Sequence, residues 1–133
     1  MKLNIGSSYQ FDFQIDQKLF NNFYDITKDN NFVHYENFTL NDNEVNSPIL
    51  FGMLIASKYS TLIGNFLPGP GSIIMDSNIK FHQPAYLNTH YTIYGEVTNI
   101  SIGLKIFTIK SNIKFKDKLI SSASFNIMIS KKT

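Results

Sequence analysis

A carboxylate and an imidazole lie close together in the segment of residues 27–34, which reads Thr-Lys-Asp-Asn-Asn-Phe-Val-His. The two groups, Asp29 and His34, are five positions apart. Such a pair can hold one water molecule while one group takes a proton from it and the other donates one. The alternative interpretation is a solvated loop acid beside a surface histidine, and the spacing alone leaves both open. Asn31 lies between them as a candidate supporting residue.

Two further candidates lie in the apolar segment that follows. Gly52 begins a predicted helix, where a backbone N–H stays free beside the positive end of the helix dipole. A substrate oxygen that gains negative charge during a reaction would be stabilised there. Ser60 falls in the apolar stripe of the same helix, where an unpaired hydroxyl costs about 1–3 kcal/mol. Ser60 therefore either bonds back to the carbonyl of Ala56 or orients a catalytic group.

Strands are the first elements that must position these residues. Five segments alternate apolar and polar residues with period two, and each places its apolar set on odd-numbered positions. The segments cover residues 9–15, 73–81, 91–97, 107–115 and 119–129. Lys116-Asp117-Lys118 is a short connection that suits a hairpin between the last two. The pattern predicts an antiparallel sheet with one covered face and one wetter face.

Two helices interrupt the strands. Asp16 can cap the first, whose apolar residues Leu19, Phe20, Phe23 and Ile26 fall on one side. The second covers residues 52–66 and ends before Pro68-Gly69-Pro70-Gly71. Its apolar stripe is Met53, Ala56, Ser60, Ile63 and Leu67, and its polar face holds only Lys58, Thr61 and Asn65. So narrow a polar face predicts a helix buried almost all round. A long buried helix wrapped by one antiparallel sheet is the α+β hot-dog arrangement.

Composition sets limits on the function. The 133 residues suit a single domain over 1–133, and the absence of cysteine excludes disulfides and thiolate chemistry. The net charge of +2 includes no concentrated basic stripe, so we expect no nucleic-acid partner. No leader or membrane-spanning run is recognisable, so we expect a cytoplasmic protein without a membrane partner. The lysines after residue 104 alternate with apolar residues and should lie on an exposed sheet face, where a few could meet ligand phosphates.

Four motifs occur in an order and spacing that resemble one family. They are Asp29-x-Asn31-x-x-His34, the run from Ser47-Pro48 through Gly52 to Ser57, Leu67-Pro68-Gly69-Pro70-Gly71, and Asn78-Ile79-Lys80-Phe81-His82-Gln83-Pro84. Together they resemble the MaoC-like (R)-specific enoyl-CoA hydratases over residues 8–130. The resemblance places the catalytic aspartate and histidine on Asp29 and His34. It places the glycine whose amide binds the thioester oxygen on Gly52, and a serine that supports the catalytic pair on Ser60.

The sequence departs from the family pattern at several positions. Lys28 replaces the glycine before the aspartate, Phe32 replaces a proline, and Phe51 replaces a common histidine. Asn88-Thr89 stands where the family usually has Gly-Asp. If the family glycine needs a positive φ, Lys28 strains the loop by about 1–2 kcal/mol. None of these changes removes a proton-transfer group.

The resemblance implies a trans-2-enoyl thioester hydratase of fatty-acid metabolism that reversibly forms the (R)-3-hydroxyacyl thioester. It also implies an acyl-CoA or acyl-carrier-protein substrate and a homodimer whose two sheets join edge to edge. The reaction needs no metal or redox cofactor. A hot-dog thioesterase is one alternative, but no Asp or Glu lies between Ile49 and Leu67, where many of those enzymes carry a catalytic carboxylate. The other is a catalytically silent protein that binds acyl thioesters.

Overall fold

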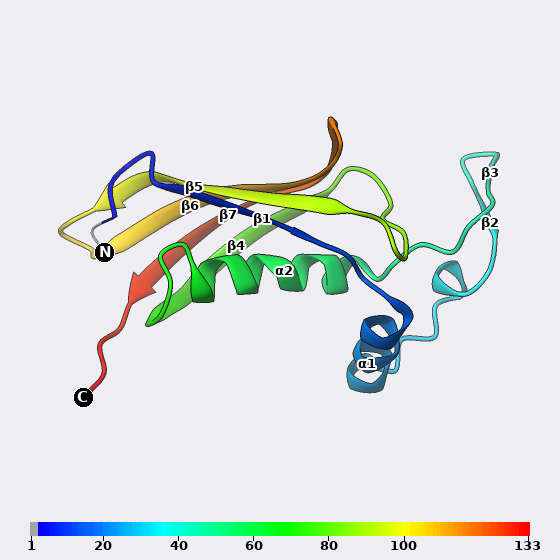
Figure 1. Ribbon diagram of the computed structural model, residues 1–133, viewed down its shortest axis with the longest axis horizontal. Coiled ribbons are helices and arrows are strands. Elements are labelled where there is room, and N and C mark those ends of the chain that lie inside the picture. The colour runs from blue at the N-terminus through cyan, green and yellow to red at the C-terminus, as the bar shows by residue number, and fades with distance from the viewer. Residues whose placement is uncertain (1–2) are drawn as a thin grey trace.

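The computed structural model describes residues 3–133 and contains a five-stranded antiparallel sheet with one long helix along its inner face (Figure 1). The strands lie in the order β1-β5-β6-β7-β4. Their bounds are β1 Ser8–Phe13, β4 Ser72–Phe81, β5 Tyr91–Ser101, β6 Ile106–Phe115 and β7 Lys118–Ile129. The helices are α1, Gln17–Thr27, and the long central α2, Gly52–Asn65. The predicted α+β arrangement of a sheet around a helix is confirmed. Within residues 3–133, no helix is long and apolar enough to cross a membrane.

The predicted alternation holds in the middle of the sheet. In β5 the odd-numbered residues from Tyr91 to Val97 are buried, and in β6 Ile109, Ser111 and Ile113 are buried. Lys116 adopts a positive φ between β6 and β7, which confirms the hairpin. Asp16 caps α1 as predicted, because its carboxylate accepts a hydrogen bond of 2.9 Å from the Leu19 amide. The inner face of the sheet and the facing side of α2 together form the core.

Two strands break the predicted phase. In β4 the register shifts between Ile74 and Asp76, so Ile74 lies opposite the buried Ile127, and Ile73 is 51% exposed. In β7 the register shifts beside Ile113, so Ile120 is buried and Leu119 is 36% exposed. An extra residue in one strand of a pair exchanges its inward and outward positions. The predicted inward positions of Ile73 and Leu119 are therefore wrong.

The prediction that α2 is buried almost all round is also wrong. Leu54, Ile55 and Leu62 are buried, but Met53 is 62% exposed and Ser60 is exposed as well. The sheet covers α2 from one side only. Residues 53, 57 and 60 follow one another at helical spacing on the opposite side, so they face away from the core. Leu19 and Ile26 of α1 are likewise exposed, while Phe20 is buried.

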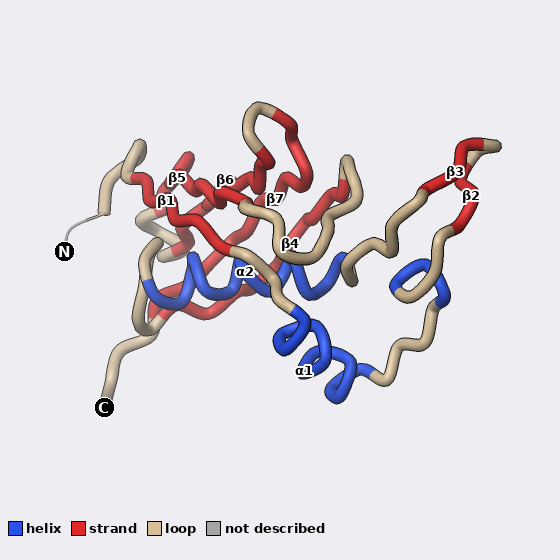
Figure 2. Tube along the Cα trace, turned by 45° about the vertical axis from the view of Figure 1, so that its right-hand side comes forward, coloured by secondary structure: helices blue, strands red, loops and turns tan. Residues whose placement is uncertain are grey.

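The chain between α1 and α2 extends beyond the end of the sheet (Figures 1 and 2). It contains a 3-10 turn, η1, over Phe32–His34, and a small hairpin of β2, Phe38–Leu40, and β3, Asn43–Val45. One backbone hydrogen bond ties its return to the segment after β4: Leu50 N–H donates to the Ala85 carbonyl at 2.8 Å. A second joins its own two ends, since Ile49 N–H donates to the Val33 carbonyl at 3.0 Å. We call residues 28–51 the overhang. It carries the predicted catalytic residues.

The close approach of α2 to β5 gives a test of this packing. A Cβ built on Gly95 lies 2.6 Å from Leu62 and 3.2 Å from Leu67, both buried. We expect Gly95→Ala to lower the free energy of unfolding by about 1–3 kcal/mol, because overpacking forces the helix away from the sheet. Gly103→Ala, whose Cβ meets nothing within 4 Å, is the matched control. Equal stabilities of the two variants in chemical denaturation would contradict this packing.

Candidate active site

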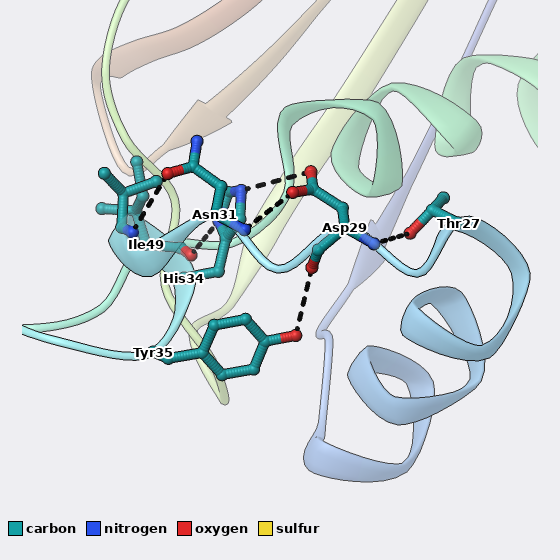
Figure 3. A network of polar contacts seen from close by, with 7 residues as sticks. Thr27, Asp29, Asn31, His34, Tyr35 and Ile49 are labelled. Carbon is teal, nitrogen blue, oxygen red and sulfur yellow. Dashed lines mark hydrogen bonds and ion pairs between the residues drawn. The ribbon is translucent and has the colours of Figure 1, made fainter.

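The carboxylate of Asp29 and the imidazole of His34 face each other in the overhang (Figure 3). The distance between Asp29 Oδ2 and His34 Nε2 is 3.8 Å, which is too long for a direct hydrogen bond. One water oxygen can contact both atoms at ordinary hydrogen-bond distance. The imidazole is only 9% exposed, while the carboxylate is 45% exposed. The pair therefore has one side toward the protein and one toward solvent.

Local hydrogen bonds shape the loop that carries this pair. Asp29 Oδ1 accepts from the Asn31 amide at 2.9 Å, and Thr27 Oγ1 accepts from the Asp29 amide at 3.2 Å. Asn31 is the N-cap of η1: its side-chain oxygen accepts from the Val33 amide at 3.5 Å and its carbonyl from the His34 amide at 3.1 Å. Asn31 thus orients the turn on which His34 lies.

A backbone carbonyl fixes the tautomer of His34. Its Nδ1 lies 2.8 Å from the carbonyl oxygen of Ile49. Because a carbonyl oxygen only accepts, Nδ1 carries the proton of this hydrogen bond. The neutral imidazole then presents a lone pair at Nε2, the atom that faces Asp29.

An aromatic cluster holds the other side of the imidazole. The ring of Phe51, which is 2% exposed, lies 4.3 Å from the ring of His34 between centroids. Phe51 also contacts Phe20 at 4.7 Å and Phe23 at 5.2 Å. It therefore joins α1, the overhang and the start of α2 around His34. A sequence pattern that reads each segment separately does not reveal this contact.

Tyr35 is a member of the network that sequence reasoning missed. Its hydroxyl donates to the carbonyl oxygen of Asp29 at 3.3 Å (Figure 3). Burial raises the pKa of Tyr35, and the neighbouring Tyr24 and Asp29 raise it further. The phenol therefore stays a neutral donor at physiological pH. Its position directly after His34 was the only available signal.

A largely apolar pocket of about 420 Å³ adjoins the pair. His34 and Gly52 both line it, and Phe38, Leu40 and Val45 of the small hairpin form one wall. The remaining lining residues are Val33, Ile49, Leu50, Ile55, Phe81, His82, Gln83, Pro84, Ala85 and Ile120. Asp29 does not line the pocket; His34, which does, lies between Asp29 and the pocket. The arrangement can place an apolar chain beside an acid–base pair.

Gly52 lies at the N-terminus of α2, and no side chain caps that end. A Cβ on Gly52 would lie 3.3 Å from the ring of Phe81, so the tight contact with this ring favours glycine. Ser60 is exposed and lies eight residues further along α2, about 12 Å away. The structure thus brings Asp29, Asn31, His34 and Gly52 to one end of α2, and it leaves Ser60 outside this group within one chain.

No protein-family model matches the sequence. An (R)-specific enoyl-CoA hydratase from Aeromonas caviae is 32% identical over 88 residues, which are 66% of this chain and 66% of that protein. One from Rhodospirillum rubrum is 25% identical over 104 residues, 78% of this chain and 72% of that protein. The solved structure of an (R)-hydratase from A. caviae matches with a TM-score of 0.84 at 25% identity, covering 96% of this chain and 97% of that chain.

The chain is similar to the (R)-specific enoyl-CoA hydratases and has the same hot-dog fold. The matched part in A. caviae spans just under two thirds of that relative's length. Within residues 3–133, no three His, Asp or Glu side chains gather as a set that could hold a metal ion.

Two departures from the family pattern fall at positions with positive φ. Lys28 has φ 56° and ψ 30°, and its amide donates to the Tyr24 carbonyl at 2.7 Å as the C-cap of α1. Asn88 has φ 56°. Glycine adopts this conformation without the steric cost of a Cβ, and asparagine tolerates it better than lysine. The expected strain at Lys28 is therefore present in the backbone.

The left-handed conformation of Lys28 predicts a stabilising substitution. Lys28→Gly should raise the free energy of unfolding by about 1 kcal/mol, since it removes the Cβ clash at a helix C-cap. Lys28→Ala is the control, because it loses the exposed 3.6 Å ion pair with Asp25 but keeps the Cβ. If both variants shift the melting temperature equally, the effect comes from the lysine side chain, and the left-handed backbone conformation is not its cause.

Proposed function

We propose that this protein is a trans-2-enoyl thioester hydratase that reversibly forms the (R)-3-hydroxyacyl thioester. The observation that carries the proposal is the pair Asp29 Oδ2 and His34 Nε2, 3.8 Å apart beside an apolar pocket. The similarity to (R)-specific enoyl-CoA hydratases supports the reaction class. The substrate is an acyl-CoA or acyl-carrier-protein thioester of fatty-acid metabolism, and a cytoplasmic location suits it.

The reaction adds one water across the carbon–carbon double bond. One member of the pair takes a proton from the water, and the water oxygen bonds to the β-carbon. The double-bond electrons move toward the thioester oxygen, where the Gly52 N–H stabilises the developing charge with help from the helix dipole. The α-carbon then takes a proton from the other member of the pair, which starts the reaction protonated. The proton taken from water afterwards moves from the first member to the second, so both groups return to their starting states. Nothing is oxidised or reduced overall, so the reaction needs no redox cofactor.

The fixed tautomer supports His34 as a proton acceptor. With Nδ1–H donated to Ile49, the neutral imidazole can accept only at Nε2. The contact with Phe51 keeps the ring in this orientation. Asn31 and Tyr35 are positioning residues, because they act on the backbone that carries Asp29 and His34.

A thioesterase fits this chain less well than a hydratase, because α2 carries no carboxylate.

We also propose a homodimer that forms through β4. Among residues 3–133 this strand pairs with β7 alone, so its other edge has free backbone donors and acceptors. Ile73, Met75 and Phe81 along it are 51%, 55% and 48% exposed. Pairing of two β4 strands would continue the sheet and cover apolar surface. In such a dimer, Ser60 of one copy would support the catalytic pair of the other copy, since Ser60 lies on the exposed side of α2.

Substitution of the pair tests the proposed chemistry. Asp29→Asn and His34→Gln should each lower kcat for crotonyl-CoA hydration by ~10²–10⁴-fold, because general acid–base catalysis contributes that much. The loss corresponds to at least about 3 kcal/mol in the barrier. The double variant should be little worse than the worse single one, since both groups act on one water.

Asp25→Asn, at an exposed acid near the end of α1, is the control and should retain full activity. Thermal denaturation of each variant separates lost chemistry from lost folding. If wild type hydrates neither crotonyl-CoA nor the carrier-protein thioester, the protein is a silent acyl-thioester binder. If both single variants keep more than a tenth of the wild-type rate, the site is wrong.

The proposed interface has its own test. Wild type should have twice the mass of one chain in light scattering at micromolar concentration. Ile73→Lys with Met75→Lys should shift it to the monomer, because lysines would be opposed across the new strand pair. Leu104→Lys, at a 68% exposed apolar residue of the β5–β6 turn, should stay dimeric. A monomeric wild type would contradict the interface.

A further inference from the structure

A polar groove runs along the outer face of the sheet, opposite α2. Its volume is about 320 Å³. It is lined by Asn78 and Lys80 of β4, Lys110 and Ser111 of β6, and Ser122, Ala123 and Ser124 of β7. It is separate from the apolar pocket and takes no part in the proposed acid–base chemistry.

The strand register explains why the groove forms. Lys80 pairs with Ser122 across β4 and β7, and Lys110 pairs with Ser124 across β6 and β7. The central strand thus presents two small hydroxyl residues, while the strands on either side present long cationic ones. The short serine side chains of β7 form the bottom of the groove and supply hydroxyl donors, and the long lysine side chains of β4 and β6 form its two sides.

The two ammonium groups have no acid partner. No carboxylate lies within 4.0 Å of either lysine nitrogen in residues 3–133. Glu96 lies opposite Lys110 across β5 and β6, but its carboxylate accepts from the Tyr94 hydroxyl at 2.8 Å. Asp76 of β4 accepts from the Asn126 side-chain amide at 3.0 and 3.1 Å. The groove therefore offers two ammonium groups without an ion pair among residues 3–133, beside hydroxyl donors and with one flanking acid, Glu96. Ammonium and hydroxyl donors suit a phosphate ester.

The groove and the apolar pocket meet at the end of β4. His82 lines the pocket, and its Nε2 forms a hydrogen bond of 2.8 Å with Ser122 Oγ in the groove floor. Phe81, the neighbour of Lys80, also lines the pocket. Side chains on opposite faces of β4 thus border the two hollows. Edge-to-edge pairing of β4 uses backbone groups and leaves the outer face open.

We propose that this groove binds a phosphate of the group that carries the acyl thioester, while the acyl chain lies in the apolar pocket. The proposal rests on the proposed function and names the second half of its substrate site. Coenzyme A carries a diphosphate and a ribose phosphate at the end remote from its sulfur, and a carrier protein carries one phosphodiester. Lys80 and Lys110 hold the phosphate, and Ser124 donates from the floor.

The test compares wild type with Lys80→Ala/Lys110→Ala. The double variant should bind free coenzyme A about fivefold or more weakly in calorimetry and show a similar rise in KM for crotonyl-CoA, as expected for two lost charge contacts. Its kcat, and its KM for crotonyl-pantetheine, which has no phosphate, should stay within about twofold. A comparison of crotonyl-CoA with the crotonyl carrier protein shows which phosphate the groove binds. If KM rises for crotonyl-CoA alone, the groove binds the nucleotide phosphates of coenzyme A. If KM rises for both substrates, the groove binds the phosphate next to pantetheine.

Lys105→Ala/Lys131→Ala is the matched control, with the same change in net charge at the β5–β6 turn and beyond the end of β7. An equal loss in this control, an unchanged affinity in the groove variant, or no binding of coenzyme A by wild type would overturn the groove. If coenzyme A binding depends on Lys80 and Lys110 but wild type hydrates no thioester, the groove stands and the proposed hydratase reaction fails.

Discussion

The burial of one side of α2 against the inner face of the sheet is the interaction on which the other features depend. Leu54, Ile55, Tyr59, Leu62 and Ile63 of the helix are buried there. Each fully buried side chain of this size contributes about 1.5–3 kcal/mol relative to an exposed one. Burial raises the pKa of Tyr59 to about 12, and its hydroxyl donates to Ser121, which in turn donates to the Lys80 carbonyl. The helix is thereby fixed to the β4–β7 pair that borders both hollows.

The fixed helix determines the geometry of the site at its N-terminus. Phe51 and Gly52 lie where α2 begins, and Phe51 packs on His34. The overhang has little core of its own, so its conformation depends on caps, backbone hydrogen bonds and this aromatic cluster. The carboxylate of Asp29 stays half-exposed while the imidazole is largely covered. Such an arrangement lets water reach the pair and still holds one member rigidly, which acid–base chemistry requires.

The alternation of the strands separates two kinds of chemistry in space. Residues of β4 and β7 that point inward build the core and reach the apolar pocket, whereas those that point outward form the lysine and serine groove. One substrate with an apolar chain at one end and phosphate at the other could use both faces of the same strands. The edge of β4 that we propose for pairing with a partner copy lies beside both hollows, and Phe81 belongs to the proposed interface and to the pocket lining.

The sequence by itself determined the five strands of the large sheet, both α-helices and the two catalytic candidates, but not η1, β2 or β3. Period-two alternation and the Pro-Gly stop after residue 67 are local patterns, set by residues close together in the chain. The strands of the large sheet, α2 and the spacing of Asp29 and His34 could therefore be predicted from the sequence. The tertiary structure alone decided the phase of β4 and β7, the exposure of Ser60, and the contact of Phe51 with His34. The physical reason is that a bulge, the side of a helix that a sheet covers and the packing of separate segments all depend on partners distant in the chain.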